Sequence, residues 1–474
     1  MANVEMTGIE IVKDAERTAQ PHNLFLPWFA SNISVFGMSY GAWILGFGIS
    51  FWQAAIISIV SVILSFAICG VIALGGKRGS VPTMVMSRSA FGVHGAKIPG
   101  IISWLTSIGW ETSLAITAVL ATNTVLARLG WAGDNSTTVK VLAAAIVAAL
   151  IVLGAVAGYH IIMRMQAWLT WITGITTIIY VFLVIPHINW STLMSAPSGS
   201  VPAMIGAGVM AMTGMGLGWV NIAADWARYQ KREAKGSHIV FWNTLGGSLG
   251  PVALITFGLM LAGSNSDLSE AIGSDPVGAL ATLLPTWFLI PFLLTAILSL
   301  LSGAINGIYS SGLTLLTLGI KVPRPLASLI DGVILTTGTI YVTFFSPTFI
   351  GPFQSFLVTL GVPLAAWAGI MMADIAMRKK NYDERALFDP QGRYGAFNIS
   401  ALIVLAVCCV IGWGFVVNGY SDASFNDWQG YLLPLIGGKE GAWGGGNIGV
   451  ILALILGFTG YYAFSAKRVR SQES

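Results

Sequence analysis

Charged residues are scarce in this sequence. Asp, Glu, Lys and Arg make up 9% of the 474 residues, whereas soluble globular domains carry about 25%. Hydrophobic residues make up 55% of the chain, and the mean hydropathy is +0.77. So little charge leaves too few groups to cover a soluble surface. The composition therefore excludes a soluble protein and indicates a polytopic membrane protein.

Groups that carry out catalysis or bind metals are also scarce. The three cysteines, Cys69, Cys408 and Cys409, fall inside apolar stretches, so they imply no disulfide framework. The five histidines lie near the ends of such stretches and form no cluster with metal-ligand spacing. No Walker sequence is present, so we do not expect ATP to drive any activity. The sequence therefore predicts neither an enzyme, nor a metal site, nor a cofactor.

Apolar stretches long enough to cross a bilayer, about 20 residues each, recur along the whole chain. The alternating segments of about ten residues that mark a β-barrel are missing. We therefore expect an all-α membrane protein with twelve transmembrane helices. Their centres lie near residues 36, 63, 112, 150, 173, 212, 250, 300, 337, 362, 406 and 455.

The distribution of positive charge predicts how these helices are oriented. With twelve spans, both ends of the chain lie on the same side of the membrane as every second loop. Of the 24 Lys and Arg residues, all but Arg128, Lys140 and Lys439 lie in those loops and ends. The positive-inside rule therefore predicts a multi-pass protein of the plasma (inner) membrane with both termini in the cytoplasm.

Two of the predicted helices are rich in glycine. The first contains FGMSYGAWILGFG (36–48), and the sixth contains MTGMGLGW (212–219). Glycine weakens a helix, and broken helices at matching positions in two halves indicate a transporter binding site. The first and sixth helices match if the first ten helices form two five-helix repeats, the second one inverted. The alternative is that these glycines only allow close helix packing.

Carboxylates inside the apolar stretches are candidates for function, because a charge in the middle of a membrane helix is unfavourable. Glu111 lies at the centre of the third predicted helix, where we expect it to carry a proton or to bind a ligand. Asp225 and Arg228 are three residues apart near the end of the sixth helix, a spacing that suits a structural or gating pair. Asp331 and Asp374 lie at helix ends, and we expect both to be solvated.

Several short motifs follow one another along the first eight predicted helices. They are WFASN (28–32), SRSAFG (87–92), GW (109–110 and 218–219), ADWARY (224–229) and NGIYSSGL (306–313). In type and order these motifs resemble the nucleobase:cation symporter family, in its purine–cytosine permease branch.

The resemblance implies a fold and a function. The fold is a five-plus-five inverted repeat with broken first and sixth helices, followed by two further helices. The function is secondary active import of a nucleobase of the cytosine or purine type by symport with H⁺ or Na⁺. We accordingly expect a cytoplasmic tail at 1–24, repeats at 25–190 and 195–380, two helices within 395–466, and a tail at 467–474.

The resemblance also implies that one aromatic side chain from the third helix and one from the sixth sandwich a planar heterocycle. Polar groups from the first, third and eighth helices then address its edges. Trp110 and Trp219, each next to a glycine, are the stacking candidates. The predicted substrate contacts are Ser39, Gly41, Trp110, Glu111, Gly216, Trp219 and Asn306, and the next residue, Gly307, shares the role predicted for Asn306.

The sequence departs from the family pattern in two places. Leu114 stands where members often carry an amide, so a hydroxymethylpyrimidine, a hydantoin or allantoin stays an alternative substrate. Leu300 and Leu301 stand where sodium-coupled members carry hydroxyl residues, although Ser299 and Ser302 flank them. Hard cations need oxygen ligands, so we favour H⁺ coupling through Glu111 over Na⁺ coupling. A channel-like facilitator is the alternative from another functional class.

Overall fold

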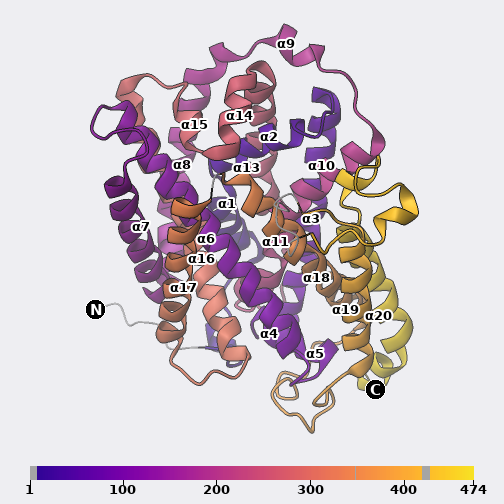
Figure 1. Ribbon diagram of the computed structural model, residues 1–474. Helices are drawn as coiled ribbons and strands as arrows, with labels where there is room; N and C mark the ends of the chain where they lie inside the picture. The colour runs from indigo at the N-terminus through magenta and orange to yellow at the C-terminus, as the bar shows by residue number, and fades with distance from the viewer. Residues whose placement is uncertain (1–7, 158, 347, 419–426, 474) are drawn as a thin grey trace.

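The computed structural model describes residues 8–157, 159–346, 348–418 and 427–473. Within these ranges the regular structure is helical, apart from one isolated bridge between Ala19 and Gln230. The long helices stand side by side, with their ends at two opposite faces of the molecule (Figure 1). The prediction of an all-α fold is confirmed.

Nine described helical segments are long and apolar enough to cross a membrane, by length and composition. Three further elements complete a set that is consistent with twelve spans: the interrupted pair α1–α2, the polar-centred α6, and the 16-residue α19. In chain order the helices are α1 (Phe25–Asn32), α2 (Phe36–Leu45), α3 (Phe51–Gly79), α6 (Lys97–Arg128), α7 (Thr137–Ala157), α8 (Tyr159–Val184), α10 (Val201–Gly214), α11 (Gly216–Trp219), α12 (Ala223–Ala227), α13 (Gly236–Ser264), α16 (Leu289–Thr317), α17 (Arg324–Phe345), α18 (Ile350–Met377), α19 (Ile399–Gly414) and α20 (Gly449–Glu473).

Local sequence signals determine where several helices begin. At the start of α3, Ser50 accepts a hydrogen bond from the backbone N–H of Gln53, and the Gln53 side chain accepts one from the backbone of Ser50. Ser200 caps α10 in a similar way, and Pro202 follows in the first turn. These caps satisfy backbone donors that the first turn of a helix leaves without a partner.

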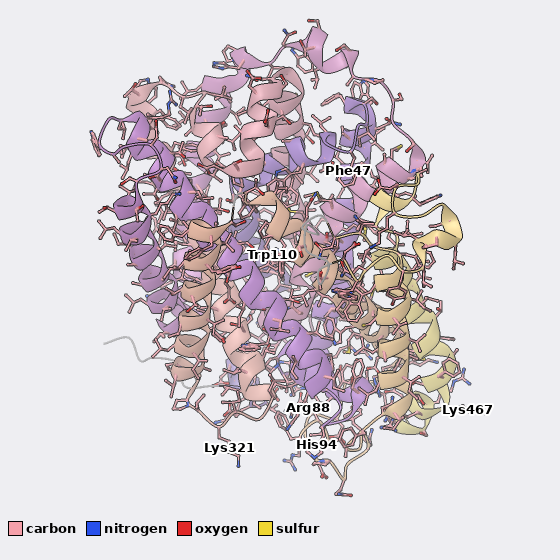
Figure 2. The ribbon with its side chains drawn as sticks, viewed as in Figure 1. Phe47, Arg88, His94, Trp110, Lys321 and Lys467 are labelled. Carbon is pink, nitrogen blue, oxygen red and sulfur yellow. The ribbon has the colours of Figure 1, made fainter. Side chains whose placement is uncertain are left out.

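The two faces of the molecule differ in charge. Figure 2 places Arg88, His94, Lys321 and Lys467 at one face, which we call the basic end. The helices α4 (Thr83–Met86) and α5 (Arg88–Phe91) lie at the basic end, whereas α9 (Trp190–Ser195), α14 (Ser266–Ser274) and α15 (Gly278–Ala281) lie at the opposite end (Figure 1). This arrangement agrees with the one-sided distribution of basic loops in the sequence.

Helix contacts divide most of the chain into two groups. The first group contains α1, α2, α3, α10, α12 and α13, and the second contains α6, α7, α16 and α17. The first group therefore contains the first, second, sixth and seventh predicted helices. The second group contains the third, fourth, eighth and ninth. Each group thus combines helices that are equivalent in the two predicted repeats, as expected for an inverted repeat. Helices α19 and α20 pack against α18.

The first and sixth helices are both interrupted, but the first break lies earlier than its glycine-rich stretch. The helix α1 ends at Asn32, residues 33–35 are not α-helical, and α2 then carries the glycines predicted to break it. In the sixth helix α10 ends at Gly214, and Met215 adopts φ −120° and ψ −121° before α11 begins. This second break lies inside the predicted stretch.

The prediction that Asp331 and Asp374 are solvated is wrong, because both side chains are fully buried. Asp374 forms an ion pair of 2.9 Å with Arg378 and accepts a hydrogen bond of 2.8 Å from Ser89. Position near a helix end does not expose these acids, since neighbouring helices and the segments that join them cover the ends.

Both predicted tails pack onto the basic end. In the N-terminal tail, whose residues 1–7 lie outside the described part, Arg17 is buried and donates to the backbone carbonyl groups of Lys77 and Gln230. In the C-terminal tail, α20 continues beyond its predicted end to Glu473, and residue 474 lies outside the described part. Gln472 there accepts a hydrogen bond of 2.7 Å from Arg378.

Candidate functional site

Trp110 lies near the middle of α6, at about mid-height of the molecule (Figure 2). Its ring meets the rings of Phe353 and Phe356 of α18 edge-on, with centroids 5.5 and 5.7 Å apart. It also reaches Gly218 of α11, where a Cβ atom would lie 2.7 Å from Nε1 of Trp110. The glycine of the second GW motif therefore makes room for the tryptophan of the first.

Trp219 follows Gly218 at the end of α11. Its ring packs edge-on against Trp28 of α1, with centroids 5.9 Å apart and planes at 89°. A Cβ atom at Gly303 of α16 would lie 3.9 Å from Cη2 of Trp219. Both predicted stacking residues, Trp110 and Trp219, keep part of their surface uncovered by protein. The two tryptophans therefore lie on neighbouring elements, with Gly218 in contact with Trp110 and directly before Trp219 in the chain.

Glu111 is the next residue of α6 and packs against α16. A Cβ atom at Gly307 would lie 2.9 Å from Cγ and 3.0 Å from Oε1 of Glu111. The side chain is fully buried, and neither carboxylate oxygen has a hydrogen-bond partner among the described residues. A buried charge without partners is costly. This carboxyl is therefore suited to bind a proton or to meet a polar ligand.

Asn306 directly precedes Gly307 on α16, where it is buried. Its Nδ2 donates a hydrogen bond to Oγ of Ser31 in the last turn of α1, and Ser31 in turn donates to the carbonyl oxygen of Pro27 at 2.8 Å. These bonds tie α16 to the segment directly before the first helix break. Contact of Asn306 with a substrate stays a prediction.

Three other predicted contacts lie in packed interfaces. Ser39 of α2 donates a hydrogen bond of 2.6 Å to a backbone carbonyl between α14 and α15. A Cβ atom at Gly41 would overlap the backbone of Gly258 in α13, and one at Gly216 would overlap the backbone of Ser65 in α3. The close-packing alternative accounts for both glycines. Direct contact of these three residues with a substrate stays a prediction.

Gly41→Leu is expected to abolish transport without preventing membrane insertion. Leucine makes α2 more apolar, which favours insertion, but its side chain would force α2 away from α13. Overpacking of this kind costs about 1–3 kcal/mol, so the midpoint of thermal unfolding should also fall. Radiolabelled uptake and protein abundance in isolated membranes measure the two effects.

Gly37→Ala is the matched control for this change, because a Cβ atom at Gly37 would meet Leu254 at an ordinary distance of 3.4 Å. The control should keep both uptake and abundance. Parental uptake by Gly41→Leu would contradict a requirement for close approach of α2 to α13.

Oxygen atoms gather where the first helix break meets α16. The hydroxyl oxygens of Ser34, in the break, and Ser299 are 3.0 Å apart, and Ser302 donates at 3.2 Å to the carbonyl oxygen of Ala30. Hard cations take hydroxyl and carbonyl oxygens as ligands. Leu300 and Leu301 occupy the positions at which sodium-coupled members carry hydroxyl residues. The serines on either side of them, Ser299 and Ser302, bring hydroxyl groups to this junction instead.

Asp225 and Arg228 take different partners at the basic end of the sixth helix. The Asp225 carboxylate accepts two hydrogen bonds of 2.7 Å from the backbone N–H and the hydroxyl group of Thr83 in α4. Arg228 donates at 3.0 Å to the carbonyl oxygen of Gly8 and at 3.2 Å to the hydroxyl group of Tyr309. These contacts join the sixth helix to α4, α16 and the N-terminal segment. A gating action stays a prediction.

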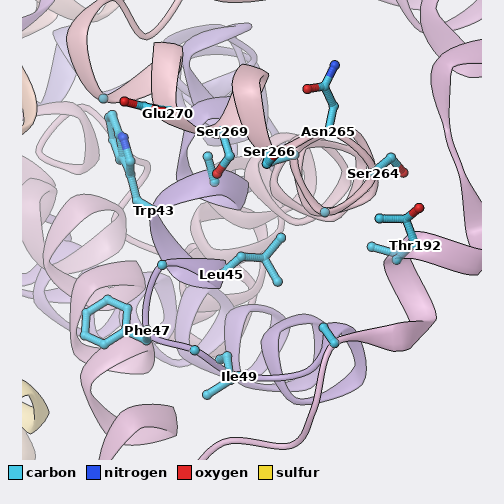
Figure 3. Close-up of a pocket in the computed structure, with 18 of the residues that line it drawn as sticks. Trp43, Leu45, Phe47, Ile49, Thr192, Ser264, Asn265, Ser266, Ser269 and Glu270 are labelled. Carbon is cyan, nitrogen blue, oxygen red and sulfur yellow. The ribbon is translucent and has the colours of Figure 1, made fainter.

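A cavity of about 1010 Å³ opens at the face opposite the basic end. Figure 3 shows polar side chains around the loop between α13 and α14, with Trp43 beside Glu270 and the apolar end of α2 nearby. The Trp43 ring lies 5.4 Å from Phe353, which lies 5.5 Å from Trp110. Aromatic rings therefore lie between the cavity and the Trp110 region.

Sequence reasoning does not single out Ser31, Gly218 and Gly303 as neighbours of the site. Ser31 and Gly218 belong to the quoted motifs, but nothing in the motifs says which side chains their positions face. Gly303 is one of several small residues on α16 and carries no signal of its own. These contacts depend on how α1, α6, α11 and α16 pack.

Comparison with known proteins adds to this geometry. The family described as "Permease for cytosine/purines, uracil, thiamine, allantoin" matches residues 11–427. "Putative purine-cytosine permease YxlA" of Bacillus subtilis (strain 168) is 26% identical, with 99% of this chain and 97% of that protein covered. "Purine-cytosine permease fcyB" of Emericella nidulans is 24% identical, with 91% and 83% covered.

A solved structure has the same fold. It is that of Mhp1, a nucleobase-cation-symport-1 family transporter, in a closed conformation with bromovinylhydantoin bound. The TM-score is 0.72 at 18% sequence identity, with 99% of each chain covered.

Proposed function

This chain belongs to the family of permeases for cytosine/purines, uracil, thiamine and allantoin, and we propose that it imports a nucleobase of the cytosine or purine type by symport with a cation. The observation that carries the proposal is that Trp110 and Trp219, both partly uncovered, lie on neighbouring elements, with the buried Glu111 directly after Trp110 in α6. Aromatic faces and a few convergent polar groups suit a planar heterocycle with a polar edge. The names of the two purine-cytosine permease relatives support the same substrate class.

In this proposal Trp110 and Trp219 stack on the two faces of the base. Glu111 and Asn306, with Gly307 beside them, address its polar edge. Ser39, Gly41 and Gly216 shape the interrupted helices around the site. Because Leu114 replaces an amide in the third helix, a hydroxymethylpyrimidine, a hydantoin or allantoin is the alternative substrate.

We propose H⁺ as the coupling ion, carried by Glu111. Symport then means that proton and base favour the same conformations, so that each strengthens binding of the other reciprocally. Na⁺ is the second candidate, because Ser34, Ser299 and Ser302 bring hydroxyl oxygens to the first helix break. Removal of sodium distinguishes the two ions.

The proposed orientation places the basic end in the cytoplasm and the large cavity of Figure 3 at the outer face of the plasma (inner) membrane. The proposed repeats span 25–190 and 195–380, and the two groups of packed helices support this division. The base would enter through the cavity and pass the aromatic rings above Trp110.

Uptake of radiolabelled cytosine tests this function in cells that lack their own permease. We expect saturable uptake that unlabelled cytosine or a purine base inhibits, with and without sodium. Competition by a panel of related heterocycles identifies the preferred substrate. Uptake that rises linearly with concentration would instead indicate a channel-like facilitator, and no uptake of any base in the panel would contradict the proposal.

A further inference from the structure

A second fully buried carboxylate lies in the same helix group as Glu111. Asp331 of α17 accepts a hydrogen bond of 2.7 Å from the hydroxyl group of Ser311 in α16. Its other oxygen accepts one of 2.8 Å from the indole N–H of Trp104 in α6. The three helices pack against one another in pairs. Asp331 is therefore held where α6, α16 and α17 meet.

Ser311, the partner of this carboxylate, lies on the same helix as the glycine that packs against Glu111. It lies four residues, or about one turn, after Gly307, which packs against the Glu111 side chain. Ser311 therefore lies on the same face of α16 as Gly307, one turn nearer the basic end, and no hydrogen bond joins it to the Glu111 carboxyl in this structure. A serine hydroxyl has one proton to donate and two lone pairs that accept. While it donates to Asp331, its oxygen can therefore accept a proton from Glu111.

Asp331 and Trp104 lie closer to the basic end of the molecule than Glu111 does. Trp104 precedes Glu111 by seven residues of α6, or about 10 Å of helix toward the basic end. Asp331 likewise follows the first residue of α17 by seven residues, or about 10 Å, and α17 begins at the basic end. Asp331 thus lies between Glu111 at mid-height and the face that we propose is cytoplasmic.

Few other titratable side chains are available to Glu111. Among the described side chains of α6, α7, α16 and α17, Asp331 is the only carboxylate besides Glu111. The other titratable groups on α7, α16, α17 and α18 are Lys140, Tyr309, Tyr341 and Asp374.

We propose that Glu111, Ser311 and Asp331 form a proton relay that carries the coupling proton from the substrate site toward the basic end. The inference rests on the proposed H⁺-coupled function. Protonated Glu111 passes its proton to the Ser311 oxygen, and the proton that Ser311 already holds passes to the Asp331 carboxylate. Glu111 is left as a carboxylate, the hydroxyl group is restored, and Asp331 becomes a carboxylic acid that releases its proton to water. Trp104 is a positioning residue that orients Asp331 toward Ser311.

Reconstituted protein in sodium-free vesicles tests the relay. In Asp331→Asn and Ser311→Ala, uptake of radiolabelled cytosine driven by a proton gradient should fall on the order of 100-fold, the lower end of what positioned proton-transfer groups contribute. Exchange of internal for external cytosine needs no proton release, so it should keep its parental rate. Ser311→Thr keeps the hydroxyl group and should keep gradient-driven uptake.

Thr314→Val is the matched control on α16. It removes a buried hydroxyl group one turn from Ser311 whose hydrogen bond of 3.1 Å goes to the backbone of its own helix. Both assays should be unchanged in this variant. Parental gradient-driven uptake in Ser311→Ala or Asp331→Asn would overturn the relay.

Infrared difference spectra between two pH values test the relay without any transported substrate, because they report protonation of buried carboxyl groups. Glu111→Gln identifies the Glu111 band. Asp331→Asn and Ser311→Ala should move the pH midpoint of that band, and Thr314→Val should not. A parent protein that neither takes up nor exchanges any base of the panel would refute the proposed function, and the band would still decide the relay. An unmoved Glu111 band in Asp331→Asn would overturn it.

Discussion

Alanine at Trp110 or at Trp219 is expected to weaken binding of the transported base by about 5- to 150-fold, which corresponds to about 1–3 kcal/mol. Each substitution removes one aromatic face that the base would contact. It also removes a ring that others hold in place, because Phe353 and Phe356 pack on Trp110 and Trp28 packs on Trp219. The larger values are therefore expected where these neighbouring rings collapse into the vacated space.

Equilibrium binding of radiolabelled cytosine to purified variants measures this effect directly. Trp168→Ala is the matched control, because Trp168 is 73% exposed on the outside of the bundle and touches no part of the site. The control should bind with parental affinity. Unchanged affinity in both Trp110→Ala and Trp219→Ala, at normal membrane abundance, would exclude the sandwich.

Glu111→Gln is expected to abolish uphill accumulation of the base while retaining binding and exchange. Glutamine keeps the shape and the hydrogen-bonding capacity of the side chain but cannot take up and release a proton. The fully buried position of Glu111 against Gly307 leaves little room for another group to replace it. A variant that binds base but no coupling proton equilibrates its substrate without concentrating it.

Steady-state accumulation and internal-for-external exchange, measured in the same vesicles, separate these two functions. Asp267→Asn is the matched control, since it makes the same chemical change at an exposed position of α14. It should accumulate the base normally. If Glu111→Gln still concentrates base in sodium-free medium with the parental pH dependence, Glu111 is not the proton site.

Hydropathy was sufficient to predict where the helices lie in the sequence. Each of the twelve predicted centres falls within a helical segment of the structure, because about 20 apolar residues in a bilayer have few alternatives to a helix. The break in the sixth helix could also be predicted, since three glycines in five residues leave the helix weak there. The first helix breaks two to four residues before Gly37, and tight packing of Gly41 against Gly258 keeps α2 helical.

The site was less accessible to sequence reasoning, because its contacts come from helices far apart in the chain. The motifs identified Trp110, Trp219 and Glu111 as candidates, but not that Gly218 makes room for Trp110 or that Gly307 packs on Glu111. Burial of Asp331 could not be read from its position near the start of α17. It follows from the contacts of that helix with α6 and α16.

Proton movement that accompanies transport tests directly whether the protein is an H⁺ symporter coupled through Glu111. Purified protein is reconstituted in vesicles that contain a pH-sensitive dye, in sodium-free medium, and cytosine is added outside. We expect cytosine to acidify the interior of vesicles that contain the parent protein at a rate proportional to its uptake, and we expect this signal to be lost in Glu111→Gln. Cytosine uptake that requires a sodium gradient and moves no protons would contradict H⁺ symport.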